Sequence, residues 1–325
     1  MYDIIGDIHG EASKLEELLL RMEYKLTNGY YSHSERKAIF VGDYIDRGSE
    51  IKRTLEIVKK MVDNGSALAV MGNHEMGIIR YFQLRKKNKL TSKQIYKLNR
   101  KHSKTLRAYK ENPQEAKKYI KWLKKLPLYL DLPDLRIVHA CWDFESINWL
   151  KENLPKGRMN KKFIKKMLEQ DSIENKITSI LLNGYSIFLP DNKKFYINKK
   201  QINTIRIKWW INPDKNLTYN KLAATSGWKP SKEKINAKNL SINLGYPKEE
   251  KPVFFGHYWR EGVPSILDSN VACVDYGAAK KEGTLVAYRF SNEKKLSNKN
   301  FIGHKKNGLL ELGKTLIRRV SLLFF

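Results

Sequence analysis

The chain has 325 residues, enough for two domains or for one domain with large insertions, and its 11% aromatic content excludes an intrinsically disordered protein. Two cysteines cannot form a disulfide framework, and no apolar run reaches the about 20 residues of a membrane-spanning helix, so we expect a cytoplasmic protein without integral membrane contact. The 62 Lys and Arg residues outnumber the 34 Asp and Glu residues, and the resulting net charge of +28 attracts polyanions and speeds the approach of anionic substrates.

In the first 80 residues, short strand-like runs alternate with amphipathic helical patterns, which is typical of an α/β fold. Residues 2–6, 38–41 and 68–71 are predicted to be buried strands. Apolar residues recur at helical spacing over residues 15–22 and 51–62, between these strands. We therefore predict a sheet flanked by helices.

A strongly basic segment follows, because residues 80–125 contain 17 Lys and Arg residues and only two acids. Its apolar residues have helical spacing, and Pro113 is expected to mark a boundary between helices. We predict a helical, Lys-rich insertion at about residues 80–130. Our interpretation is a solvated helical face, and the alternative is a surface that binds polyanions nonspecifically or steers substrates.

The second half of the chain contains further strand-like runs. They are residues 135–138, 253–255, 272–274 and 284–288. Residues 151–250 mix Lys-rich helical stretches with aromatic pieces, and we treat them as a second insertion. These features predict one domain over residues 1–292, followed by a C-terminal tail over residues 293–325 that is expected to be helical.

Polar side chains of the kind that bind metals follow five of the predicted strands. They are Asp7 and His9, Asp43, Asn73, His139 and His257. In an open α/β sheet, ligands bind in the crevice beyond the carboxyl ends of the strands, so these residues can converge although they are far apart in sequence. Two carboxylates, an amide oxygen and three imidazoles suit two divalent ions, with Mn as the first choice and Fe or Zn as alternatives.

The motifs that contain these residues resemble, in order, those of calcineurin-like metallophosphoesterases. The matching stretches are Asp7-Ile8-His9, Gly42-Asp43-Tyr44-Ile45-Asp46-Arg47-Gly48, Gly72-Asn73-His74-Glu75, His139 and Gly256-His257. The most similar branch is the phosphoprotein phosphatase-like one, which also contains the bacterial symmetrical diadenosine tetraphosphatases. The resemblance covers roughly residues 1–290, and it implies a β-sandwich core flanked by helices, with residues 1–292 as the catalytic domain.

The resemblance implies a role for each metal-type residue. Asp7 and His9 would hold one ion, Asn73, His139 and His257 would hold the other, and Asp43 would bridge the two. The two ions would share a hydroxide that attacks phosphorus directly, without a phosphoenzyme intermediate.

The resemblance also implies catalytic residues outside the metal set. His74 would protonate the leaving group, Asp46 would orient its imidazole, and Arg47 would hold the phosphoryl oxygens. A second substrate-binding arginine is usual in this family, and Arg206 is our candidate.

Two stretches depart from the branch. His139 is followed by Ala140 and Cys141 rather than by the commoner glycine pair, and residues 273–277 lack the Ser-Ala-Pro-Asn-Tyr sequence that is typical of eukaryotic protein phosphatases. These departures leave the substrate class open.

From these features we predict a metal-dependent phosphatase that hydrolyses phosphomonoesters, whose substrate is a phosphoprotein, a nucleotide or a nucleic-acid end. One alternative is a symmetrical dinucleoside tetraphosphatase. An alternative of another class is a basic nucleic-acid-binding module or a nucleic-acid end phosphatase, which the basic insertion suggests.

Overall fold

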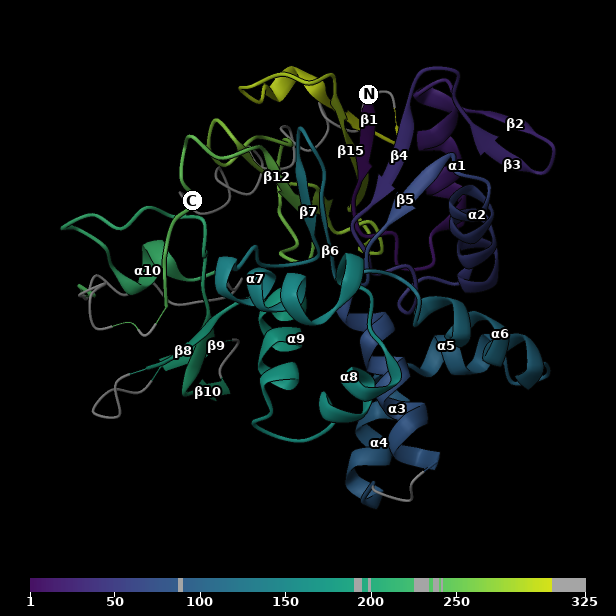
Figure 1. Cartoon of the computed structure of the whole chain (residues 1–325), viewed down its shortest axis with the longest axis horizontal. Helices are drawn as coiled ribbons and strands as arrows, with labels where there is room; N and C mark the ends of the chain where they lie inside the picture. The colour runs from purple at the N-terminus through teal and green to yellow at the C-terminus, as the bar shows by residue number, and fades with distance from the viewer. Residues whose placement is uncertain are drawn as a thin grey trace, which may run out of the picture.

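The structure of the protein is a computed structural model that describes residues 1–86, 90–189, 195–197, 200–224, 234–235, 240 and 242–305. Two β-sheets form its centre, and helices lie around them (Figure 1). The α/β sandwich predicted from the sequence is therefore confirmed.

Parallel strands in both sheets carry the predicted site loops. The larger sheet has the spatial order β14 (Asp275–Tyr276), β15 (Thr284–Phe290), β1 (Tyr2–Ile5), β4 (Lys37–Phe40) and β5 (Ala67–Ala69), with β16 (Phe301–Gly303) also paired to β15. The smaller sheet has the order β13 (Val271–Cys273), β12 (Val253–Phe255), β7 (Arg136–Val138) and β6 (Tyr129–Asp131). Strands β1, β4 and β5 run parallel, as do β7, β12 and β13.

Successive side chains of the strands alternate between two hydrophobic cores. Ile4 of β1 and Phe254 of β12 belong to the cluster between the sheets, whereas Ile5 and Phe255 belong to the cluster on their outer faces. All four side chains are fully buried. Because both faces of the sheets are covered, the strands are continuous apolar runs in the sequence rather than alternating ones.

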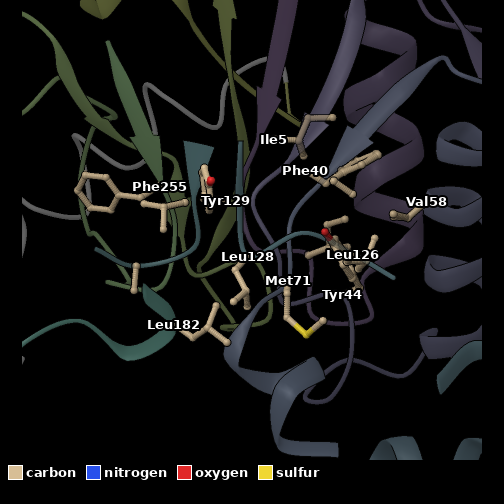
Figure 2. Packing of buried hydrophobic residues seen from close by; sticks show 14 of the residues in the cluster. Ile5, Phe40, Tyr44, Val58, Met71, Leu126, Leu128, Tyr129, Leu182 and Phe255 are labelled. Atoms are coloured by element: carbon tan, nitrogen blue, oxygen red, sulfur yellow. The ribbon is translucent and has the colours of Figure 1, made fainter. Parts of the chain in front are cut away.

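The outer cluster joins the sheets to the surrounding helices. It includes residues of α1 (Ala12–Arg21), α2 (Ile51–Asp63), α7 (Phe144–Asn153) and α9 (Ile173–Asn183). Figure 2 shows Val58 of α2 on the side of Phe40, and Leu182 of α9 on the side of Phe255. Beside the larger sheet, β2 (Lys25–Thr27) and β3 (Tyr30–Ser32) form a hairpin.

The basic insertion expected at about residues 80–130 is helical in the structure. It contains the end of α3 (Asn73–Lys86), followed by α4 (Ser92–Lys101), α5 (Ser103–Ala108) and α6 (Pro113–Leu123). The Asn112 side chain caps α6, and Pro113 occupies its first turn, where a missing backbone N–H costs nothing. Because α3 begins directly after β5, it connects the sheet edge to the insertion.

The second insertion is mixed rather than only helical. It contains α8 (Lys161–Lys166), α9, α10 (Tyr219–Leu222), and the antiparallel strand pairs β8 (Ser186–Phe188) with β11 (Thr204–Arg206) and β9 (Phe195–Ile197) with β10 (Lys200–Ile202). A small hydrophobic cluster that includes Ile187, Ile205 and Leu222 gives this part a core of its own.

The described part of the C-terminal tail, residues 293–305, differs from the helix expected there. Asn298–Asn300 is a single 3-10 turn, and β16 extends the larger sheet by antiparallel pairing with β15. Phe301 of β16 packs against Tyr288 of β15, with ring centroids 5.1 Å apart. The remainder of the tail, residues 306–325, lies outside the described residues. Among the described helices, none is both long and apolar enough to cross a membrane.

Candidate metal centre

Loops at the carboxyl ends of strands in both sheets bring the predicted metal ligands together. Asp7 and His9 follow β1, Asp43 follows β4, Asn73 begins α3, and His139 and His257 follow β7 and β12. Asn73 is half-buried and the other five side chains are buried. Residues up to 250 positions apart in the sequence therefore face one small volume.

Asp43 lies in the middle of this group. Its Oδ2 is 3.5 Å from His9 Nε2, and its Oδ1 is 3.5 Å from His139 Nε2. Ligand atoms of His9, Asp43 and His74 lie within 4.8 Å of one another, and so do those of Asp43, His139 and His257. Asp43 thus directs one oxygen toward each group, as a carboxylate between two cations must.

Two of the histidines direct Nε2 toward this centre. His9 Nδ1 donates to the Ile45 carbonyl at 3.0 Å, and His139 Nδ1 donates to the Val41 carbonyl at 2.8 Å. A carbonyl oxygen only accepts, so a neutral ring carries its proton on Nδ1 and its lone pair on Nε2. His139 Nε2 also lies 3.1 Å from the amide oxygen of Asn73, which is another acceptor. Such converging lone pairs favour a cation between them.

Buried carboxylates make the centre electrostatically suited to positive charge. Burial, together with repulsion from Asp275 and Asp43, raises the pKa of Asp7. Burial opposes protonation of His139, but attraction to Asp43 outweighs it and raises the pKa of His139. Both shifts have the direction expected of a site that gains stability from added positive charge.

Buried polar atoms without a hydrogen-bond partner also indicate a site for cations. Among the described residues, Asp7 Oδ1, His9 Nε2 and His257 Nε2 are buried without a hydrogen-bond partner. Buried polar atoms in folded proteins are normally satisfied, so these three need a partner that the chain does not supply. Carboxylate, amide and imidazole donors in this arrangement fit two divalent cations.

The backbone of the ligand loops adopts conformations that non-glycine residues rarely take. His9, Asp43, Asp46, Arg47 and His257 have φ angles between 50° and 70°. Such residues cost roughly 1 kcal/mol or more each and persist where the surroundings fix them, which is typical of functional sites.

Glu75 fixes one of these loops, although the sequence predicted no role for it. Its carboxylate accepts hydrogen bonds from the backbone N–H groups of Gly72, Asp43 and Tyr44 at 3.0, 2.8 and 2.9 Å. Glu75 is fully buried in the first turn of α3. It therefore ties the loop after β4 to the loop after β5.

His74, the predicted proton donor, is held through one ring nitrogen. Its Nδ1 donates to Asp46 Oδ2 at 2.6 Å. Burial acts to raise the pKa of Asp46, but hydrogen bonds from His102 and His74 outweigh it and lower that pKa, so Asp46 is ionised and can only accept. His74 Nε2 is left facing the centre, 3.9 Å from Asp43 Oδ2.

Two residues of the basic insertion, for which the sequence predicted no role, also hold Asp46. His102 Nδ1 donates to Asp46 Oδ2 at 2.7 Å, and the Thr105 hydroxyl donates to Asp46 Oδ1. His102 follows Leu98 by four residues and shares its inward helix face, so a polar residue at a core position was the available sequence signal.

The two predicted arginines come from the loop after β4 and from the end of β11. The Arg47 guanidinium stacks 4.0 Å above the ring of Trp259, whose supporting role the sequence did not predict. Arg47 and His74 also line a cavity of about 310 Å³. Arg206 is half-buried at the end of β11, and its charge acts with burial to lower the pKa of His257.

Comparisons with known proteins give both a family and more distant similarities. Residues 2–257 match the family model described as calcineurin-like phosphoesterase. The asymmetrical bis(5'-nucleosyl)-tetraphosphatase PrpE of Oceanobacillus iheyensis is 35% identical over 139 residues, which cover 42% of this chain and 54% of that protein. The PrpE of a Geobacillus species is 32% identical over 144 residues, which cover 42% of this chain and 55% of that protein. The chain thus spans about half the length of the curated relatives it matches.

Solved structures are less similar. A protein serine/threonine phosphatase from Saccharomyces cerevisiae aligns over 93% of this chain and 78% of its own, with 13% identity and a TM-score of 0.48. Similarity at this level does not identify a function.

Proposed function

Because the chain belongs to the calcineurin-like phosphoesterase family, we propose that it hydrolyses phosphoester bonds with two divalent metal ions. The observation that carries the proposal is the position of Asp43, whose two oxygens each lie 3.5 Å from a different histidine. A buried carboxylate between two histidine groups is the feature that a dinuclear centre requires and that an ordinary core does not.

Six residues would hold the ions. Asp7 and His9 would bind one, Asn73, His139 and His257 would bind the other, and Asp43 would bind both. When bound, such ions act as Lewis acids toward the phosphoryl group and make a water molecule more acidic. Mn is our first choice, with Fe or Zn as alternatives, because all three accept this mixture of oxygen and nitrogen ligands.

The remaining site residues would act on the substrate directly. His74 would give a proton from Nε2 to the departing oxygen, since its Nδ1 is engaged by Asp46. Asp46, being ionised, would stabilise the protonated ring before that transfer. Arg47 would hold phosphoryl oxygens through its N–H groups while Trp259 supports its guanidinium. Arg206 would be the second arginine that binds the substrate.

Metal dependence tests this function. Protein freed of metal with a chelator is assayed on 4-nitrophenyl phosphate before and after addition of Mn²⁺, alongside His257→Ala. We expect activity only with metal, and a loss of at least about a hundredfold in the variant. Full activity without metal, or an active His257→Ala protein, would contradict the proposal.

Two substrate classes remain within this function. Phosphomonoesters are the first candidate, and dinucleoside tetraphosphates are favoured by the names of the relatives. Chromatography of the products from diadenosine tetraphosphate separates the cases. Symmetrical cleavage, the alternative that the sequence analysis named, yields two ADP, and asymmetrical cleavage yields ATP and AMP. A pure phosphomonoesterase leaves the compound intact.

A further inference from the structure

A cleft of about 940 Å³ leads away from the candidate metal centre. Its floor is one face of α3, formed by Asn73, Met76, Gly77 and Arg80, and its walls are α4 and α9. Because Asn73 is a candidate metal ligand, a substrate whose phosphoryl group sits at the centre can extend directly into this cleft.

All the charged residues that line this cleft are cations. They are Arg80, Lys93, Lys97, Arg100 and Lys101. Within the described part of the chain, none of the five forms an ion pair or hydrogen bond with an acid, whereas cations elsewhere do, such as Lys52 with Glu115. Burial alone lowers the pKa of Arg80, with no acid to offset it. Unpaired cations around one hollow attract a ligand with several negative charges.

The cleft meets the catalytic side of the centre at the end of α4. Arg100 and Lys101 line both this cleft and the 310 Å³ cavity that contains His74 and Arg47. Lys101 Nζ lies 3.4 Å from the position that a Cβ on Gly77 would take, one turn of α3 after Asn73. Because His74 would protonate the departing oxygen, the leaving group lies on this side.

An exposed aromatic ring lies in the same wall. Tyr96 of α4 is 69% exposed and lines the cleft, close in sequence to the cations Lys93 and Lys97. A tyrosine face beside a row of cations is suited to a ligand that combines phosphates with a nucleobase, since bases stack on aromatic side chains. An isolated phosphate would not use both features.

We propose that this cleft binds the leaving-group half of a nucleoside polyphosphate substrate, with the phosphate chain on the cations of α4 and α3 and the base on Tyr96. The proposal rests on the function proposed above, chooses the nucleotide class from its two substrate classes, and adds a binding site for it. A small aryl phosphate reacts at the same centre without reaching the cleft, which makes the two claims separable.

Charge reversal in α4 tests the phosphate part. Lys93→Glu/Lys97→Glu changes two exposed residues that touch no candidate catalytic group. We expect the KM for diadenosine tetraphosphate to rise about tenfold, while kcat/KM for 4-nitrophenyl phosphate stays within about twofold. The control Lys118→Glu/Lys125→Glu makes the same change in net charge at exposed positions outside both cavities, and should leave both substrates unaffected.

Substitution of the aromatic ring tests the nucleoside part. Tyr96→Ala should weaken ATP binding to the metal-free protein about fivefold or more in titration calorimetry, whereas Tyr96→Phe should bind like the wild type. Inorganic tripolyphosphate, which has no base, should bind Tyr96→Ala and wild type equally.

Several outcomes would overturn this inference. Equal losses on both substrates in the α4 variant would mean that the helix only supports the centre, and an equal loss on a phosphopeptide would exclude specificity for nucleotides. Equal ATP affinity in Tyr96→Ala and the wild type would contradict the proposal that the base binds to Tyr96. A wild-type protein that hydrolyses neither substrate with Mn²⁺ would instead refute the proposed function, and ATP binding to the metal-free protein would still test the cleft.

Discussion

His102 and Asp46 are joined by a hydrogen bond of 2.7 Å from the ring Nδ1 to the carboxylate Oδ2, the same oxygen that accepts from His74. His102 is fully buried, and a Cβ on Gly77 of α3 would lie 2.9 Å from its ring. The basic insertion is therefore in direct contact with the residue that orients the proposed proton donor.

Replacement of His102 should weaken proton donation without touching the metal centre. In His102→Ala, Asp46 loses one of its donors and holds His74 less firmly, so we expect kcat to fall about tenfold for substrates with basic leaving groups. Phosphates of acidic phenols, which leave without a proton, should lose much less. A series of aryl phosphates with different leaving-group pKa values measures this difference.

His102→Asn serves as the conservative control, because its amide N–H can take the place of Nδ1 as donor. It should recover most of the activity on basic leaving groups. A uniform loss across the whole series, with no recovery by asparagine, would show that His102 only stabilises the fold.

The close approach of Gly256 to Asp7 should limit what this position tolerates. A Cβ on Gly256 would lie 2.0 Å from Asp7 Oδ1, so Gly256→Ala must displace a proposed metal ligand. We expect a free energy of unfolding lower by about 1 to 3 kcal/mol and the loss of one of the two metal ions. Metal analysis and denaturant titration measure the two effects.

Gly65→Ala is the matched control for that substitution. Gly65 has a φ of 74° and open space around it, so alanine there costs stability through backbone strain alone. It should keep its full metal content. Two bound ions in Gly256→Ala would show that Asp7 is not held where the structure places it.

Asp131 should make the free energy of unfolding depend on pH. Burial opposes its ionisation, but hydrogen bonds from Lys151 and Lys251 outweigh it and lower the pKa of Asp131 to about 2. Because the folded-state pKa is below the unfolded one, this carboxylate contributes about 1 to 2 kcal/mol above pH 4, and the contribution is lost as the pH falls toward 2.

Asp131→Asn should therefore be less stable than the wild type at pH 6, and the difference should be much smaller at pH 2.5. Denaturant titrations at the two pH values give the comparison. A difference that stays constant between them would mean that Asp131 acts through packing and not through its charge.

The metal-type residues could be anticipated from the sequence because their positions follow from local patterns. Each comes directly after a short apolar run, and parallel strands of one sheet end at the same edge. Asp7, Asp43 and Asn73 could thus be grouped without knowing the contacts between strands, whereas His139 and His257 follow strands of the other sheet. The helices of the basic insertion were equally accessible, since their apolar spacing and Pro113 are local features.

The supporting residues could not be predicted in the same way. His102 meets Asp46 across 56 residues, and Trp259 meets Arg47 across more than 200, so neither contact has a local pattern. Glu75 lies inside a recognised motif, yet its backbone partners become visible only when the loops after β4 and β5 are folded together. The strand β16 lies where a helix was expected, and its pairing with β15 and the contact of Phe301 with Tyr288 have no local pattern in the sequence.

Metal stoichiometry in wild type and Asp43→Asn tests the central claim most directly. Protein equilibrated with Mn²⁺ is freed of unbound metal, and its metal content per chain is measured by elemental mass spectrometry. Asp134 is an exposed acid outside the centre, so Asp134→Asn is the control. We predict two ions per chain in the wild type and in Asp134→Asn, and one or none in Asp43→Asn. One ion or none in the wild type, or two in Asp43→Asn, would contradict the account.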